Sequence, residues 1–192
     1  SLQALERVEL YSNQRFESRP AKRSEFYKYM KEEQLKNRIR TYGDKSHSEG
    51  DPFASFLSIW KCLNVLMKHN STKHIDRAMI NELKQRQENM RPLFEAYDAA
   101  LVFKNDDGLM KRSVTALVNM SREKPIEDHK GKMDPVMISD EKDFGNLVEA
   151  IYRIRCYLSH GGLDEDDTIN QALVKNAKNI LQQWIGRLVA SW

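Results

Sequence analysis

The sequence predicts an all-α protein, and three observations carry that prediction. Glycine and proline are scarce, at 8 and 5 of 192 residues, while good helix formers such as leucine, lysine, glutamate and arginine are plentiful. Runs that alternate between apolar and polar residues, as strands do, are missing. Apolar residues recur instead every three or four positions. We therefore expect one helical domain over residues 1–192, in which a basic helical extension, residues 1–50, precedes an up-and-down bundle, residues 52–190.

Composition narrows the class of protein further. Apolar residues make up 40% of the chain and charged residues 31%, a balance that suits a folded globular domain. The two cysteines, Cys62 and Cys156, are too few for a disulfide framework and suit a reducing compartment. No run of about 18 apolar residues exists, and the first residues lack the layout of a signal peptide. We expect a cytoplasmic protein with no membrane partner.

The first half of the chain predicts four helices. The clearest start is Asp51-Pro52, where a capping aspartate precedes a proline at the first helical position. The stripe of apolar residues that follows contains one polar member, Asn64. The predicted segments are, in order, a helix over 2–13, a break at Ser18–Pro20, a helix over 21–42, a loop over 43–51, a helix from 52, and a helix from a Ser71 or Thr72 cap to Asn89.

The second half predicts four more helices and one long loop. Residues 121–140 hold two prolines and a glycine and show no helical period, and loops of that length are often functional. An acidic turn, Asp164–Asp167, precedes the last helix. The predicted helices run from Arg91-Pro92 to Phe103, from Asp106 or Asp107 to Met120, from Glu141 to Ser159, where Gly161-Gly162 follow, and from Thr168 to Ala190.

A basic stretch near the N-terminus is a candidate for nucleic-acid binding. Residues 15–40 hold nine lysines and arginines against four glutamates, with four aromatic residues interleaved. Such a stretch could follow a phosphate backbone and offer faces for bases to stack on. A solvated helix face is the alternative, since charge runs often mean only that. The candidate binding residues are Lys22, Arg23, Lys28, Lys31, Lys36, Arg38 and Arg40.

The stretch IYRIRCYLSHGG, residues 151–162, concentrates reactive side chains at the end of an apolar helix. Arg155 and His160 are five residues apart, which separates them by about 140° on an unbroken helix. They can meet only if the helix unwinds at His160, which the two following glycines permit. Arg153 and Cys156, by contrast, share a helix face with His160 without any unwinding.

These residues leave four interpretations open. A metal site would use Cys156 and His160 with His129 or His74, although no spacing supports it and we expect neither a metal nor a cofactor. Cys156 and His160 could form a nucleophile pair. Alternatively, His160 could exchange protons while Arg155 binds a phosphate through its planar fork of donors. Finally, His160 could simply cap the helix, where the dipole favours its charge.

Two motifs resemble the HEPN superfamily, particularly its Apea-like and related stand-alone members. RIRCYLSHGG shows the R-x4-H spacing followed by Gly-Gly, and FLSIWKCLNVL, residues 56–66, resembles the upstream F-x3-W-x3-N helix of such proteins. The order, with the motif helix followed by one long final helix, is also similar. The resemblance covers about residues 52–103 and 144–188.

The resemblance implies a dimeric helical bundle in which two copies of the motif face each other in one cleft. Many members are metal-independent endoribonucleases, some in defence or toxin-like systems. By position, His160 would exchange protons, Arg155 would hold the phosphate of an RNA substrate, and Ser159, Asn64 and Arg153 would support them. Many ribonuclease members carry a polar residue where this chain has Cys156.

Two alternatives to catalysis stay open. The first is a non-catalytic HEPN module that binds RNA or a nucleotide or pairs with a partner protein. The second is a purely structural interaction domain.

Overall fold

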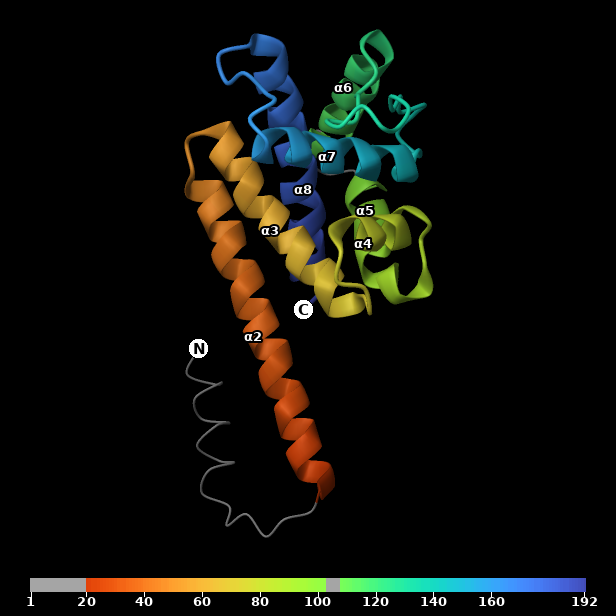
Figure 1. Cartoon of the computed structure of the whole chain (residues 1–192). Helices are drawn as coiled ribbons and strands as arrows, with labels where there is room; N and C mark the ends of the chain where they lie inside the picture. The colour runs from red at the N-terminus through yellow and green to blue at the C-terminus, as the bar shows by residue number, and fades with distance from the viewer. Residues whose placement is uncertain (1–19, 103–107) are drawn as a thin grey trace. The chain divides into compact units, whose positions relative to one another are not determined.

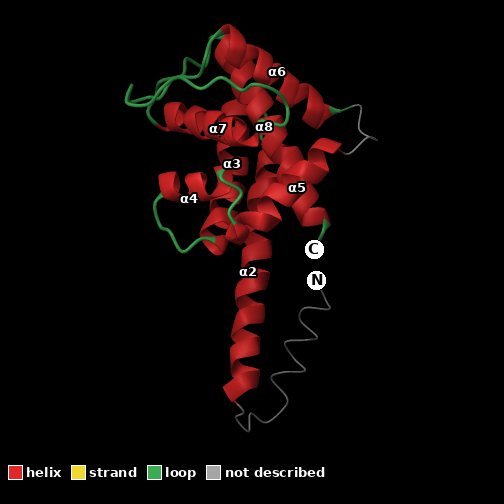
Figure 2. Cartoon of the chain, turned by 90° about the vertical axis from the view of Figure 1, so that its right-hand side faces the viewer, coloured by secondary structure: helices red, strands yellow, loops and turns green. Residues whose placement is uncertain are grey.

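The computed structural model describes residues 20–102 and 108–192, with side chains described from residue 31 onward. The predicted helix over 2–13, the break at Ser18–Pro20 and the Asp106 or Asp107 cap lie wholly or partly outside these residues. The described chain is all-α and forms a helical bundle without strands (Figure 2). Its helices are α2 (Pro20–Ser48), α3 (Pro52–Asn70), α4 (Asp76–Lys84), α5 (Arg91–Val102), α6 (Leu109–Glu123), α7 (Phe144–Ser159) and α8 (Thr168–Ala190), with a 3-10 turn over Glu88–Met90.

Two compact units divide the chain within α2, one over Ser1–Lys36 and one over Asn37–Trp192. The second unit contains the last turns of α2 and all the later helices, so it begins before the Asp51-Pro52 start of α3. The expectation of one domain with its bundle starting at residue 52 stays a prediction.

Helix α8 is the centre of the second unit. It packs against α3, α5 and α6, while α7 runs crosswise to it and packs against α4 (Figure 1). Trp184 of α8 is fully buried and donates from Nε1 to the carbonyl of Leu93, 2.7 Å away. The rings of Tyr97 and Phe144 pack around it with centroids 5.4 and 5.7 Å away. Aromatic contacts of this kind add to the burial energy, so this cluster fastens α5, α7 and α8 together.

The last turns of α2 correct the prediction that residues 43–51 form a loop, because the helix continues to Ser48. Two buried serines explain the continuation. The Ser46 hydroxyl donates to the carbonyl of Ser55 and the Ser55 hydroxyl donates to that of Ser46, at 2.9 and 2.6 Å. Gln182 of α8 also donates to the Ser46 hydroxyl. These contacts across the sequence outweigh the local preference of Gly43 and its neighbours for a turn.

The cysteine Cys62 makes a further contact between α3 and α2. Its thiol is fully buried and reaches the carbonyl of Ile39 at 3.3 Å. Burial raises the pKa of Cys62 to about 12. The side chain therefore packs as a small apolar residue with a weak donor.

The start and end of α4 also differ from the prediction of a helix from Ser71 or Thr72 to Asn89. The Ser71 hydroxyl is engaged by the buried carboxylate of Glu82, and its backbone N–H closes α3 on Met67. The helix begins only at Asp76 and ends at Lys84. Arg86 follows with a φ of +50°, which a helix cannot accommodate.

The remaining boundaries agree with the sequence more closely. α3 begins at Pro52, with the Asp51 carboxylate accepting from the N–H groups of Phe53 and Ala54. α8 spans Thr168–Ala190 as predicted and is capped in the same way by Asp167. The predicted long loop is present and joins α6 to α7, over residues 124–143.

A buried carboxylate joins α7 to α4. Glu149 of α7 is 1% exposed and accepts hydrogen bonds from Arg77 and Lys84 of α4 and from Arg153 one turn further along α7. Burial alone would raise the pKa of Glu149, but the hydrogen bonds from these three cations outweigh it and lower the pKa to about 2. A buried charge is tolerated only when it is paired in this way.

The substitution Glu149→Gln tests this cluster. It leaves three cations, one of them buried, without their carboxylate, so we expect a loss of about 3–5 kcal/mol of unfolding free energy at pH 7. The pKa of Glu149 falls on folding from 4.5 to about 2. The ionised Glu149 carboxylate therefore adds its full share to the free energy of unfolding above about pH 4.5, and this share disappears as the pH falls toward 2. Denaturant unfolding of both proteins between pH 7 and pH 2 measures this difference.

The matched control is Glu88→Gln, which removes an exposed carboxylate paired with Arg91. An exposed ion pair contributes about 0–1 kcal/mol, so the unfolding free energy of the control should stay close to that of wild type. If wild type and Glu149→Gln differ in unfolding free energy as much at pH 2 as at pH 7, the ionised carboxylate does not have the proposed role.

Candidate functional site

The helix α7 ends immediately before His160. The His160 N–H donates to the carbonyls of Cys156 and Tyr157, at 3.1 and 3.2 Å. Gly161 then adopts a φ of +68°, and the N–H of Gly162 donates to the Tyr157 carbonyl at 2.9 Å. This left-handed turn is a common helix end and needs glycine at its first position. The glycine pair therefore stops the helix at the place that the sequence predicts.

Arg155 lies at the surface of α7 and contacts α4. Its side chain is 29% exposed, and its Nη2 is 3.5 Å from Oδ2 of Asp76. The other carboxylate oxygen of Asp76 accepts from Nδ2 of Asn64, on α3, at 3.1 Å. Asp76 thus links Arg155 to the predicted supporting residue Asn64. One long contact uses few of the five guanidinium N–H donors, which leaves the others able to bind a ligand.

His160 contacts the 124–143 loop and has an exposed side chain. Its ring stacks on that of His129, with centroids 4.6 Å apart and planes 6° from parallel. The Nδ1 atom of His129 lies 3.5 Å from Oδ1 of Asp128, while its Nε2 atom is buried without a hydrogen-bond partner. The predicted catalytic histidine is therefore one member of a stacked histidine pair.

Arg153 has a different environment from Arg155, although only two residues separate them. Arg153 is 2% exposed and is hydrogen bonded to Glu149. Its Nη1 atom donates to the carbonyls of Ile126 and Asp134, at 2.8 and 2.9 Å, in the 124–143 loop. This predicted supporting residue therefore anchors the loop from inside the protein.

The structure does not bring Arg155 and His160 into contact. Among the described residues no hydrogen bond, ion pair or ring contact joins them, and each contacts a different element. Ser159 is exposed at the last position of α7, and its hydroxyl makes no hydrogen bond to another described residue. Cys156, the other half of the suggested nucleophile pair, is buried, and it is the backbone carbonyl of this residue that contacts His160.

The part of the chain that the structure describes holds no group of three or more His, Cys, Asp or Glu side chains that could hold a metal ion. None of its helices is long and apolar enough to cross a membrane.

The predicted nucleic-acid-binding residues all belong to α2. Lys31, Arg38 and Arg40 are exposed. Lys36 is half-buried and lies 3.8 Å from the carboxylate of Glu33. The side chains of Lys22, Arg23 and Lys28 lie outside the described residues.

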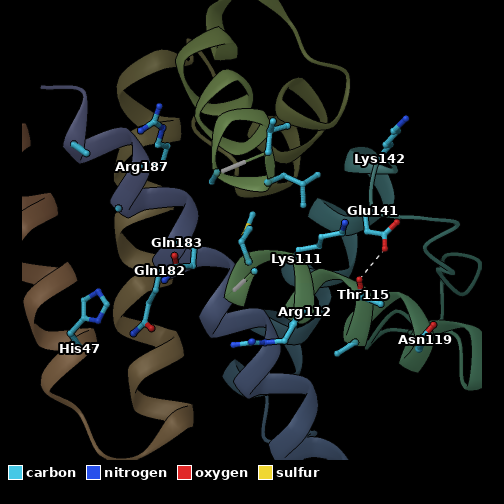
Figure 3. A pocket seen from close by; sticks show the side chains of 18 residues that line it. His47, Lys111, Arg112, Thr115, Asn119, Glu141, Lys142, Gln182, Gln183 and Arg187 are labelled. Carbon is cyan, nitrogen blue, oxygen red and sulfur yellow. Dashed lines mark hydrogen bonds between the residues drawn. The ribbon is translucent and has the colours of Figure 1, made fainter. Parts of the chain in front are cut away.

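A pocket of about 1270 Å³ lies away from the motif, between α2, α5, α6 and α8 (Figure 3). Its lining includes Lys111, Lys142 and Arg187, but the charged ends do not converge. Lys142 and Arg187 point away from the cavity, and Lys111 extends toward Glu141 (Figure 3). A site for an anion needs donors that converge on one point, and these three side chains do not form one.

Sequence reasoning missed Asp76, and it named His129 only as a possible ligand of a metal site. Asp76 contacts Arg155 from 79 positions earlier in the chain, and His129 contacts His160 from a loop without periodicity. The only available signal for His129 was its place in a long loop. Asp76 gave no such signal, because the predicted helix from Ser71 or Thr72 placed it inside the helix, whereas it is the first residue of α4.

The turn after His160 can be tested with Gly162→Ala. A Cβ at this position would lie 2.6 Å from Cδ1 of Tyr157, so the ring or the turn must shift, at a cost of about 1–3 kcal/mol. Gly186→Ala is the control, since a Cβ there meets no atom within 4 Å and alanine favours a helix by about 0.5–1 kcal/mol. Thermal unfolding should show a lower Tm for the first variant and an equal or higher Tm for the second. A Gly162→Ala protein as stable as wild type would show that the turn tolerates a side chain.

Comparison with known proteins found no relative of this chain. No family model, no curated protein and no solved structure matches the chain. The function has to be inferred from the residues at the end of α7 and their neighbours.

Proposed function

We propose that this protein is a HEPN-type endoribonuclease that cuts RNA without a metal ion, with Arg155 and His160 as its catalytic residues. One observation carries the proposal. Within the motif, Arg155 and His160 are accessible at the end of α7, while Arg153 and Cys156 are buried. Each of the two accessible groups is steadied by a side chain from another element, Asp76 or His129.

The chemistry suits these two side chains. In the proposed reaction the RNA 2′-hydroxyl attacks the adjacent phosphorus and gives its proton to His160. The bond from phosphorus to the 5′-oxygen breaks, the leaving oxygen takes up a proton, and a 2′,3′-cyclic phosphate remains. Arg155 would bind the phosphate and its developing charge through the guanidinium donors that Asp76 leaves unused.

A homodimer would complete the site. Within one chain Arg155 and His160 contact different elements, and the resemblance to HEPN proteins implies that two motifs face each other. A second copy could then supply the group that protonates the leaving oxygen. The exposed Arg38 and Arg40 of α2 would add attraction for the RNA backbone, which high salt would weaken.

The test is incubation of the purified protein with mixed RNA in the presence of EDTA. The wild type should cut the RNA and leave cyclic-phosphate ends. His160→Ala should lower the rate by about 10²–10⁴-fold, the usual contribution of a general acid or base. Arg155→Ala should lower it by a similar factor, because the phosphate then loses its charged donor.

Matched controls separate the motif from general effects of mutation. His74→Ala removes another exposed histidine, and Arg91→Ala removes another exposed arginine. Both should cut RNA at the wild-type rate. A folded His160→Ala protein that retains full activity, or cleavage that EDTA abolishes, would overturn the proposal.

A non-catalytic module that binds RNA or a nucleotide is the second candidate. The separation of Arg155 from His160 favours it, because each side chain has its own neighbour and the two do not form a pair. This candidate predicts that wild type binds RNA without cutting it, and that Arg155→Ala weakens binding more than His160→Ala does. A binding assay beside the cleavage assay distinguishes the two functions.

A further inference from the structure

The 124–143 loop is held by contacts with two helices and by one pair of hydrogen bonds within the loop. Arg153 binds two of its carbonyls from α7. The backbone groups of Ile126 and Val136 exchange two hydrogen bonds of 2.8 Å across the loop. The N–H of Ile138 donates to the buried hydroxyl of Ser121, on α6. A loop held at so many points can place a side chain with precision.

A tight turn within this loop positions His129. Oδ2 of Asp128 accepts from the N–H of Lys132 at 3.1 Å, and Gly131 adopts a φ of +61° to close the turn. Burial opposes the charge on Asp128, but hydrogen bonds from the Lys132 and Lys130 N–H groups outweigh it, so its pKa is lowered. The carboxylate of Asp128 is therefore ionised, and its Oδ1 lies 3.5 Å from Nδ1 of His129.

The ring of His129 then forms a fixed surface for His160. The His129 side chain is only 17% exposed, and Tyr157 of α7 packs at 74° to it with centroids 6.4 Å apart. His160 is exposed, and within the described residues its ring has no hydrogen bond. Stacking on His129 is thus the contact that orients it. An exposed side chain without such a contact would sample several rotamers.

We propose that His129 is a positioning residue that holds the His160 ring in the orientation needed for proton transfer. This inference rests on the proposed function, and it assigns a role to a residue outside the motif. His129 acts through its stacked ring, and Arg153 contributes by holding the loop. Proton transfer depends strongly on orientation, so loss of the stack should lower kcat and leave KM, which reports substrate binding, unchanged.

The first experiment tests the stack and does not depend on RNA cleavage. NMR of the histidine rings, with the His160 signals assigned from the His160→Ala spectrum, detects the shielding that a stacked ring produces. We expect the His160 ring protons to be shielded in wild type, to move toward free-histidine values in His129→Ala, and to stay shielded in His129→Phe. Met137→Ala, which removes an exposed side chain of the same loop, should change nothing. An unchanged His160 signal in His129→Ala would overturn the inference.

The second experiment measures cleavage by the same variants. His129→Ala should lower kcat by about 10- to 100-fold with KM unchanged, the scale expected for a misplaced catalytic group. His129→Phe, which keeps the ring and loses the nitrogens, should restore kcat to within about threefold of wild type. Full activity in His129→Ala, or a His129→Phe protein that keeps the stack and is as slow as His129→Ala, would overturn the positioning role.

The NMR and cleavage experiments test the role of His129 and the proposed function separately. A wild-type protein that cuts no RNA overturns the proposed function, while the NMR comparison still decides whether His129 orients His160. Active wild type with an unshielded His160 leaves the proposed function standing and overturns the role of His129.

Discussion

The buried ion cluster at Glu149 is the constraint on which the end of α7 depends. Its carboxylate binds two cations from α4 and one from its own helix. Taking these charges out of water is costly unless every partner is present, so α4 and α7 must pack in one register. That register places Asp76 beside Arg155. The third cation, Arg153, transmits the same constraint to the 124–143 loop and so to His129.

Much of the fold follows from local signals in the sequence. The capping aspartates Asp51 and Asp167 set the starts of α3 and α8, and both agree with the structure. The boundaries that were wrong depend on contacts between distant residues. Ser46 and Ser55 pair across the end of α2, and the Ser71 hydroxyl binds Glu82 and leaves α4 without that cap. No local pattern indicates such partners.

In the candidate site, too, local features could be predicted from the sequence, and contacts between distant residues could not. The glycine pair indicated correctly where α7 ends, because a left-handed turn is a local property. The direction that each polar side chain takes depends on its tertiary neighbours. Arg153 and Arg155 are two residues apart in the same helix, yet one is buried beneath a loop and the other is partly open to solvent. The positions of the two arginines along α7 do not predict which of them contacts the 124–143 loop.

The two buried cysteines have a practical consequence for work on this protein. Both thiols are shielded from solvent, and the raised pKa of Cys62 keeps it in the unreactive thiol form. Alkylating reagents attack thiolates that they can reach. The native cysteines of the folded chain should therefore react little with maleimide dyes. A single cysteine introduced on the exposed face of α2 or in the 124–143 loop could then carry a spectroscopic label, with the native pair left in place.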